Sequence, residues 1–195
     1  MNSESSLSYA YVNGKRVARL KGEGYFQVSK DRKHPFVVQV GNLNIEVLGT
    51  CFNVYSYEEN DFVETSLIEG SVRLYDSKSP SESFILKPSQ KAIYSKNNGK
   101  ISFHNTDNVK ETAWTQNHLV FESEKLGSVF QKIERWYGVH IDLLCPEIAN
   151  DQISGSFKDE QLPYVMEALK FQYGFNYEIT GNNVTINKSN QLKIK

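Results

Sequence analysis

Short runs that alternate apolar and polar residues fill the chain from about residue 16 to residue 103. Leu43–Val47 places an apolar side chain at every second position, which is the period of a half-buried strand. The Asn-Asn-Gly sequence at 97–99 is typical of a hairpin turn. Gly22-Glu23-Gly24 is interpreted as a bulge or tight bend between two strands. The pattern predicts an all-β domain over residues 1–104, as a sandwich or jelly-roll-like fold, a barrel or a short β-solenoid.

The pattern changes after residue 104. Residues 105–116 are polar, with Trp114 as their only large apolar side chain. We interpret this segment as a linker or a short helix.

The last third of the chain repeats itself after 36 residues. The shift aligns Phe121 with Phe157, Leu126 with Leu162, Val129 with Val165, Ile133 with Leu169 and Tyr137-Gly138 with Tyr173-Gly174. Each copy predicts a strand, a helix and a strand. The result is a C-terminal α+β domain at 117–188, built from two pseudo-repeated β-α-β units and followed by a tail at 189–195.

The first predicted helix covers residues 123–137. It carries Leu126, Val129, Phe130 and Ile133 on one face, which predicts that they form core. Asp159 is predicted to cap the second helix.

The composition of the chain argues against several classes of function. The 22 basic and 23 acidic residues give a net charge of −1, which does not favour a nucleic-acid partner. No apolar stretch approaches the roughly 20 residues that a membrane helix needs, and the N-terminus does not resemble a signal peptide. This fragment is therefore not expected to contact a membrane itself.

Signatures of cofactor and metal sites are missing from the sequence. It contains no glycine-rich phosphate loop, and its four histidines lack the spacing of metal ligands. We expect no cofactor, no metal and no enzyme activity on another molecule. Cys51 and Cys145 are interpreted as two buried thiols, with one disulfide as the alternative.

Gly49-Thr50 is the one dipeptide with chemical content. If the peptide bond were strained, the Thr50 hydroxyl could attack the Gly49 carbonyl and convert the amide into an ester, which water would cleave. The alternative is an ordinary bulge or bend in a strand.

Several motifs in sequence order resemble the FecR family. They are Arg-Val-Ala-Arg-Leu-Lys-Gly-Glu-Gly-Tyr-Phe-Gln-Val at 16–28, Pro-Phe-Val-Val at 35–38, Val-Leu-Gly-Thr-Cys-Phe-Asn-Val at 47–54, Leu-Ile-Glu-Gly-Ser-Val at 67–72 and Leu-Lys-Pro-Ser-Gln-Lys-Ala at 86–92. Trp114, Leu-Val-Phe at 119–121 and Ile-Glu-Arg-Trp-Tyr at 133–137 resemble the C-terminal module common in such proteins.

The resemblance implies a transmembrane anti-sigma factor of Gram-negative cell-surface signalling. Its periplasmic C-terminal module would bind the signalling domain of an outer-membrane TonB-dependent transporter and resemble that domain, and the signal would control release of an extracytoplasmic-function sigma factor. The sequence shows neither the membrane helix nor the cytoplasmic sigma-binding segment, so we expect it to be the periplasmic part alone. Self-cleavage at a bond that matches Gly49-Thr50 is also implied for some members.

For partner contact we expect Trp136, Tyr137 and the strand residues Val139, His140, Ile141 and Asp142, with an exposed strand edge at 184–186 or 119–121 accepting a partner strand. A carbohydrate-binding envelope protein is the alternative. Tyr25, Tyr55, Tyr57 and Tyr75 would then form its sugar platform, which needs at least two aromatic side chains exposed on one face.

Overall fold

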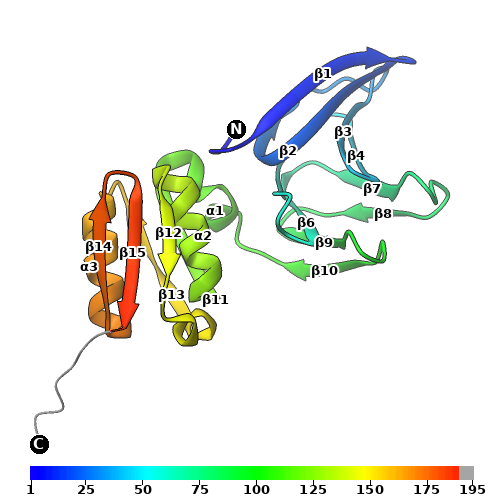
Figure 1. Cartoon of the computed structure of the whole chain (residues 1–195). Coiled ribbons are helices and arrows are strands. Elements are labelled where there is room, and N and C mark those ends of the chain that lie inside the picture. The colour runs from blue at the N-terminus through cyan, green and yellow to red at the C-terminus, as the bar shows by residue number, and fades with distance from the viewer. Residues whose placement is uncertain (189–195) are drawn as a thin grey trace, which may run out of the picture. The chain divides into compact units, whose positions relative to one another are not determined.

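The computed structural model describes residues 1–188 and divides the chain into two compact units (Figure 1). The first comprises Met1–Gln116 and the second begins at Asn117. The tail predicted at 189–195 lies outside the described residues.

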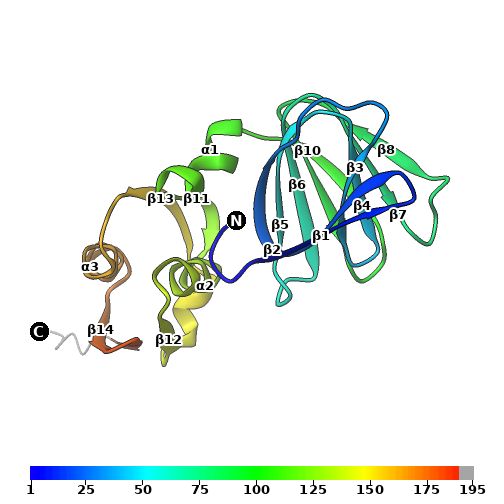
Figure 2. The ribbon, with the colours of Figure 1, turned by 90° about the horizontal axis from the view of Figure 1, so that it is seen from above.

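The N-terminal unit is a single ten-stranded sheet that curls around its own apolar core (Figure 2). The sheet order is β10-β9-β6-β5-β2-β3-β4-β7-β8, and β1 also pairs with β2. Its strands are β1 (Ser6–Val12), β2 (Lys15–Gln27), β3 (Phe36–Val40), β4 (Leu43–Val47), β5 (Cys51–Ser56), β6 (Phe62–Glu69), β7 (Val72–Asp76), β8 (Ser83–Leu86), β9 (Gln90–Ser95) and β10 (Ile101–Asn105).

Strand β2 connects the two halves of this sheet. Its first part pairs with β1 and β3, and its second part, from Gly22, pairs with β5. The prediction that Gly22-Glu23-Gly24 lies between strands is therefore wrong, because the segment lies inside β2. Gly22 has φ +87°, and a side chain there would overlap Ser5, so only glycine fits where the strand changes partners.

Residues 106–116 fold as part of the N-terminal unit. They form helix α1 (Asn108–Thr112) and the 3₁₀ helix η1 (Ala113–Gln116). Asp107 caps α1 by accepting a hydrogen bond from the Val109 N–H, and Ala113 is buried. Of the two interpretations of this segment, the short helix describes residues 108–112.

Residues 117–188 of the second unit form five strands in two sheets. Its elements are β11 (His118–Lys125), α2 (Leu126–Tyr137), β12 (His140–Leu143), the 3₁₀ helix η2 (Pro146–Asn150), β13 (Gln152–Lys158), α3 (Leu162–Tyr173), β14 (Phe175–Thr180) and β15 (Asn183–Lys188). Strands β11 and β13 form one antiparallel pair. Strands β12, β15 and β14 form the other sheet, in that order (Figure 1).

Helix α2 follows β11 directly, three residues separate α3 from the end of β13, and each helix ends at a glycine. Gly138 and Gly174 have φ +65° and +68°, the left-handed conformation that ends a helix. Leu126, Val129, Phe130 and Ile133 are buried together, which confirms the predicted apolar face.

Two details of the predicted helices are wrong. Helix α2 begins at Leu126 rather than near residue 123, because β11 continues to Lys125, which pairs with Gln152 of β13. Asp159 does not cap α3, since the N-cap residue is Gln161 and Asp159 itself has φ +54°.

Candidate functional site

Within residues 1–188, strand β12 lies at one edge of its sheet. It pairs in parallel with β15, and the His140 N–H donates to Asn182 O and the Leu144 N–H to Ile186 O. In a parallel ladder the residues that bond to one neighbour alternate with residues whose main-chain groups point the other way. The N–H and C=O groups of Ile141 and Leu143 therefore point outward from the sheet, where a further strand would bind.

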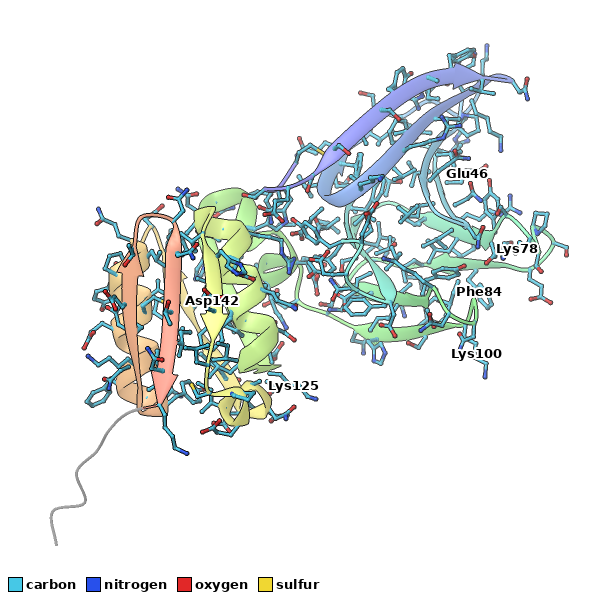
Figure 3. The ribbon with its side chains drawn as sticks, in the orientation of Figure 1. Glu46, Lys78, Phe84, Lys100, Lys125 and Asp142 are labelled. Carbon is cyan, nitrogen blue, oxygen red and sulfur yellow. The ribbon has the colours of Figure 1, made fainter. Side chains whose placement is uncertain are left out.

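The outward N–H of Ile141 already has a partner. It donates to Glu134 Oε1 of α2 at 2.7 Å. His140 lies beside this contact, with Nδ1 3.1 Å from Glu134 Oε1 and Nε2 3.2 Å from Asp142 Oδ1. Figure 3 labels Asp142 on this strand.

The residues predicted for partner contact differ in their burial. His140 is exposed and the Asp142 carboxylate is 44% exposed, while the Ile141 side chain belongs to the core. Trp136, Tyr137 and Val139 are half-buried against the same core, and the Tyr137 hydroxyl donates to Glu160 O. Ile141 can therefore contact a partner through its main chain but not through its buried side chain.

Of the two strand edges expected to accept a partner, the one at 184–186 is wrong. These residues lie in β15, which is paired on both sides, with β12 and with β14. The other, at 119–121, lies in β11, which pairs only with β13 among residues 1–188.

Sequence reasoning did not single out Glu134. One signal was available, because a carboxylate in the last turn of a helix is unfavourable beside the negative end of the helix dipole. A glutamate four residues before a helix-ending glycine therefore indicates a nearby donor, which the structure identifies as Ile141 N–H.

Gly49 and Thr50 lie between β4 and β5 in a turn that only glycine can form. Gly49 has φ +145°, and a Cβ there would stand 2.6 Å from Lys30 Cα. The Thr50 main chain pairs with Val28 in both directions, and its hydroxyl donates to Ser71 O at 3.0 Å. This hydroxyl, which is the predicted nucleophile, is hydrogen-bonded to a carbonyl oxygen, which is not a base.

A cluster of charges holds α1 against the sheet of the N-terminal unit. Lys91 Nζ of β9 lies 3.1 Å from Glu111 Oε1 and 3.1 Å from Glu64 Oε2, and Ser66 and Thr106 donate to Glu111. Burial alone would raise the pKa of Glu111, but Lys91 and the two hydroxyls outweigh it, so that this pKa is lowered.

A second polar chain crosses the same unit. Glu23 is buried and accepts hydrogen bonds from the side-chain amides of Asn2 and Asn53, and Asn53 Oδ1 accepts from Trp114 Nε1. This series of hydrogen bonds connects the N-terminal segment with η1 through the interior of the unit.

The four tyrosines of the carbohydrate alternative do not form an exposed platform. Tyr57 is buried, with its hydroxyl donating to Ser3 O, and Tyr25, Tyr55 and Tyr75 are half-buried. The condition set for this alternative, two aromatic side chains exposed on one face, is not met by these residues.

Three further observations limit the chemistry of residues 1–188. No group of three or more histidine, cysteine or acidic side chains in that range is arranged to hold a metal ion. Both Cys51 and Cys145 are free thiols, the first half-buried and the second buried. None of the helices described is both long and apolar enough to cross a bilayer.

Comparisons with known proteins agree with these features. Residues 1–73 match the family model described as FecR protein, and residues 118–186 match the model described as FecR, C-terminal. Two crystal structures of a candidate anti-sigma factor from Parabacteroides distasonis superpose with TM-scores of 0.85 and 0.84, each at 28% identity. The superpositions cover 97% of this chain and 89% and 88% of the other. A search of curated proteins finds no match.

Each of the two family models matches one unit, and the range matched by the C-terminal model includes β12 and the Glu134 contact with it. The chain therefore belongs to the FecR family of anti-sigma factors and corresponds to the periplasmic region of such a protein.

Proposed function

We propose that this chain relays a signal across the periplasm by binding the signalling domain of an outer-membrane TonB-dependent transporter. The second unit would receive the signal, and the full-length anti-sigma factor would then release its extracytoplasmic-function sigma factor. Membership of the FecR family supports a role for this chain in sigma-factor control. That the partner is a transporter is our inference from the family.

The observation that carries this proposal is the outer edge of β12. Main-chain N–H and C=O groups on a sheet edge without a neighbouring strand can accept a partner strand, which supplies affinity without a deep pocket. The edge is short, with four residues in β12, so we expect binding in the micromolar range, as for many transient signalling contacts.

The test is a binding titration between this chain and the purified signalling domain of the transporter encoded beside it. Leu143→Pro removes one outward N–H that takes no part in the ladder with β15, and proline is tolerated at such edge positions. We expect this variant to keep its secondary structure, measured by circular dichroism, and to bind at least tenfold more weakly.

A surface variant elsewhere in the second unit provides the control. Phe171 on α3 is 92% exposed, so Phe171→Asp changes a large apolar group without affecting the core or β12. We expect its dissociation constant to equal that of the wild type. No binding by the wild type at high micromolar concentration would overturn the proposal, and loss of binding in Phe171→Asp would move the interface to α3.

A further inference from the structure

Glu134 is brought to the edge of β12 by the way α2 ends. Its main-chain oxygen accepts hydrogen bonds from the N–H groups of Gly138 and Val139, which close the last turn of the helix. Gly138, with φ +65°, then reverses the chain so that β12 starts beside that turn. The short connection places the Glu134 carboxylate against Ile141.

No strand lies on the outer side of β12 in the described part of the chain, and the Glu134 carboxylate takes that place. The Ile141 N–H points away from β15, and in an extended sheet it would donate to a carbonyl oxygen of the next strand. Glu134 Oε1 accepts this N–H at 2.7 Å instead. A strand cannot use the same N–H until the carboxylate leaves.

The corresponding position of the second helix lacks this contact. Helix α3 also ends at a left-handed glycine, Gly174, but the residue four positions before it is Lys170. A lysine ammonium has no acceptor to offer a main-chain N–H. Lys170 instead pairs with Glu167 at 3.2 Å and lies over the Tyr177 ring at 5.8 Å. The carboxylate contact therefore occurs at the β12 edge alone of the two, and it is not a general consequence of ending a helix at a left-handed glycine.

The charges around the edge indicate what kind of segment fits it. Glu134 and Asp142 contribute two carboxylates, and the His140 ring lies between them, 3.1 Å from the first and 3.2 Å from the second. When Glu134 leaves the Ile141 N–H, its carboxylate loses this donor and retains the contact with His140. An extended segment with a lysine or arginine beside its pairing carbonyl would supply both a replacement acceptor and a cation.

We propose that Glu134 is a built-in competitor for the β12 edge. A basic extended segment of the transporter's signalling domain adds beside β12, and its main-chain carbonyl replaces the Glu134 carboxylate at the Ile141 N–H. This inference rests on the proposed function and adds to it the receiving strand, the chemistry of the docking segment and a self-masking contact that keeps the edge closed until the partner arrives.

Removing Glu134 has two opposite effects on the affinity for a basic segment. It frees the Ile141 N–H for the partner, and it takes away one carboxylate that attracts the segment. A hydrogen bond to a charged acceptor is about twice as strong as a neutral one, whereas an exposed ion pair contributes little. Removing the competitor therefore outweighs losing one carboxylate from the edge. Glu134→Ala should bind the signalling domain about tenfold more tightly than the wild type.

The experiment titrates the signalling domain of the neighbouring transporter into the full chain and its variants by calorimetry. Glu134→Gln keeps a neutral acceptor at the N–H, so its affinity should fall between those of the wild type and Glu134→Ala. Glu167→Ala removes an exposed glutamate from α3 and is the matched control, expected to leave the affinity unchanged. Asp142→Asn should weaken binding severalfold, because it removes a charge that the basic segment meets.

Amide exchange of Ile141, followed by NMR, gives a second measurement. Its N–H should exchange at least tenfold faster in free Glu134→Ala than in the free wild type, and slowly in both complexes. If the wild type binds and Glu134→Ala binds with the same affinity, this inference is overturned and the proposed function stands. The same holds if the complex does not protect the Ile141 N–H from exchange. Absence of binding in both the wild type and Glu134→Ala would overturn the proposed function and this inference with it.

Discussion

Lys91 Nζ lies 3.1 Å from Glu111 Oε1, and this ion pair joins strand β9 to helix α1. The two side chains are only 18% and 10% exposed, so solvent screens the pair less than it would a surface pair. The segment that ends the N-terminal unit is therefore held by a specific charge contact as well as by packing.

Lys91→Met should destabilise the N-terminal unit by about 2–4 kcal/mol, because it leaves Glu64 and Glu111 without their common cation. The measurement is urea unfolding followed by tryptophan fluorescence in a Trp136→Phe background, so that the signal comes from Trp114 in the neighbouring 3₁₀ helix. Lys78→Met, at an exposed position, is the control and should change stability by less than about 0.5 kcal/mol.

The same cluster predicts a dependence of stability on pH. The pKa of Glu111 is lowered in the folded state, so its contribution is present above its ordinary value of about 4.5 and is lost as pH falls through the lower folded value. Stability measured between pH 7 and pH 3 should therefore fall less in Glu111→Gln than in the wild type. Parallel pH curves for the two proteins would contradict this assignment.

Gly49→Ala should lower the stability of the N-terminal unit by roughly 2–4 kcal/mol, because it adds both backbone strain at φ +145° and overlap with Lys30. Gly41→Ala separates the two causes, since Gly41 has φ +56° but no atom within 4 Å of an added Cβ. We expect about 1 kcal/mol there. Equal losses in the two variants, measured by thermal unfolding, would show that the contact with Lys30 is unimportant.

Intact mass spectrometry tests the Gly49-Thr50 bond. We expect one species at the full 22.3 kDa, because the Thr50 hydroxyl donates to Ser71 O and not to a base that could remove its proton. Two fragments that meet at Gly49-Thr50 would contradict this expectation and establish self-cleavage. Thr50→Ala, which lacks the nucleophile, would in that case remain whole.

Asn53→Asp should destabilise the N-terminal unit by about 2–4 kcal/mol, since it replaces the amide that donates to buried Glu23 with a second carboxylate. Asn53→Ala removes the donor without adding a charge and should cost less. The measurement is thermal unfolding at neutral pH, and a smaller loss in Asn53→Asp than in Asn53→Ala would contradict this account.

Local patterns along the chain were enough to predict the mainly β character of the fold and several of its elements. The period-2 alternation of Leu43–Val47 predicts a strand, and β4 has these bounds. The apolar positions of α2 share one face because helix geometry alone places residues three and four apart together. The Asn-Asn-Gly sequence predicts a hairpin, and Gly99 takes φ +71° between β9 and β10. Each of these features depends on a few consecutive residues.

Strand pairing could not be predicted in the same way. Strand β15 lies between β12 and β14, and β2 changes partners at Gly22, because each pairing depends on residues far apart in sequence. The docking of α1 through Glu111 and the contact of Glu134 with Ile141 depend equally on where the chain returns. The sequence alone determined elements such as β4 and the apolar face of α2, since each depends on side chains that are neighbours along the chain. The tertiary structure decided which edge is free and which side chain covers it, since a hydrogen bond forms only when folding brings donor and acceptor together.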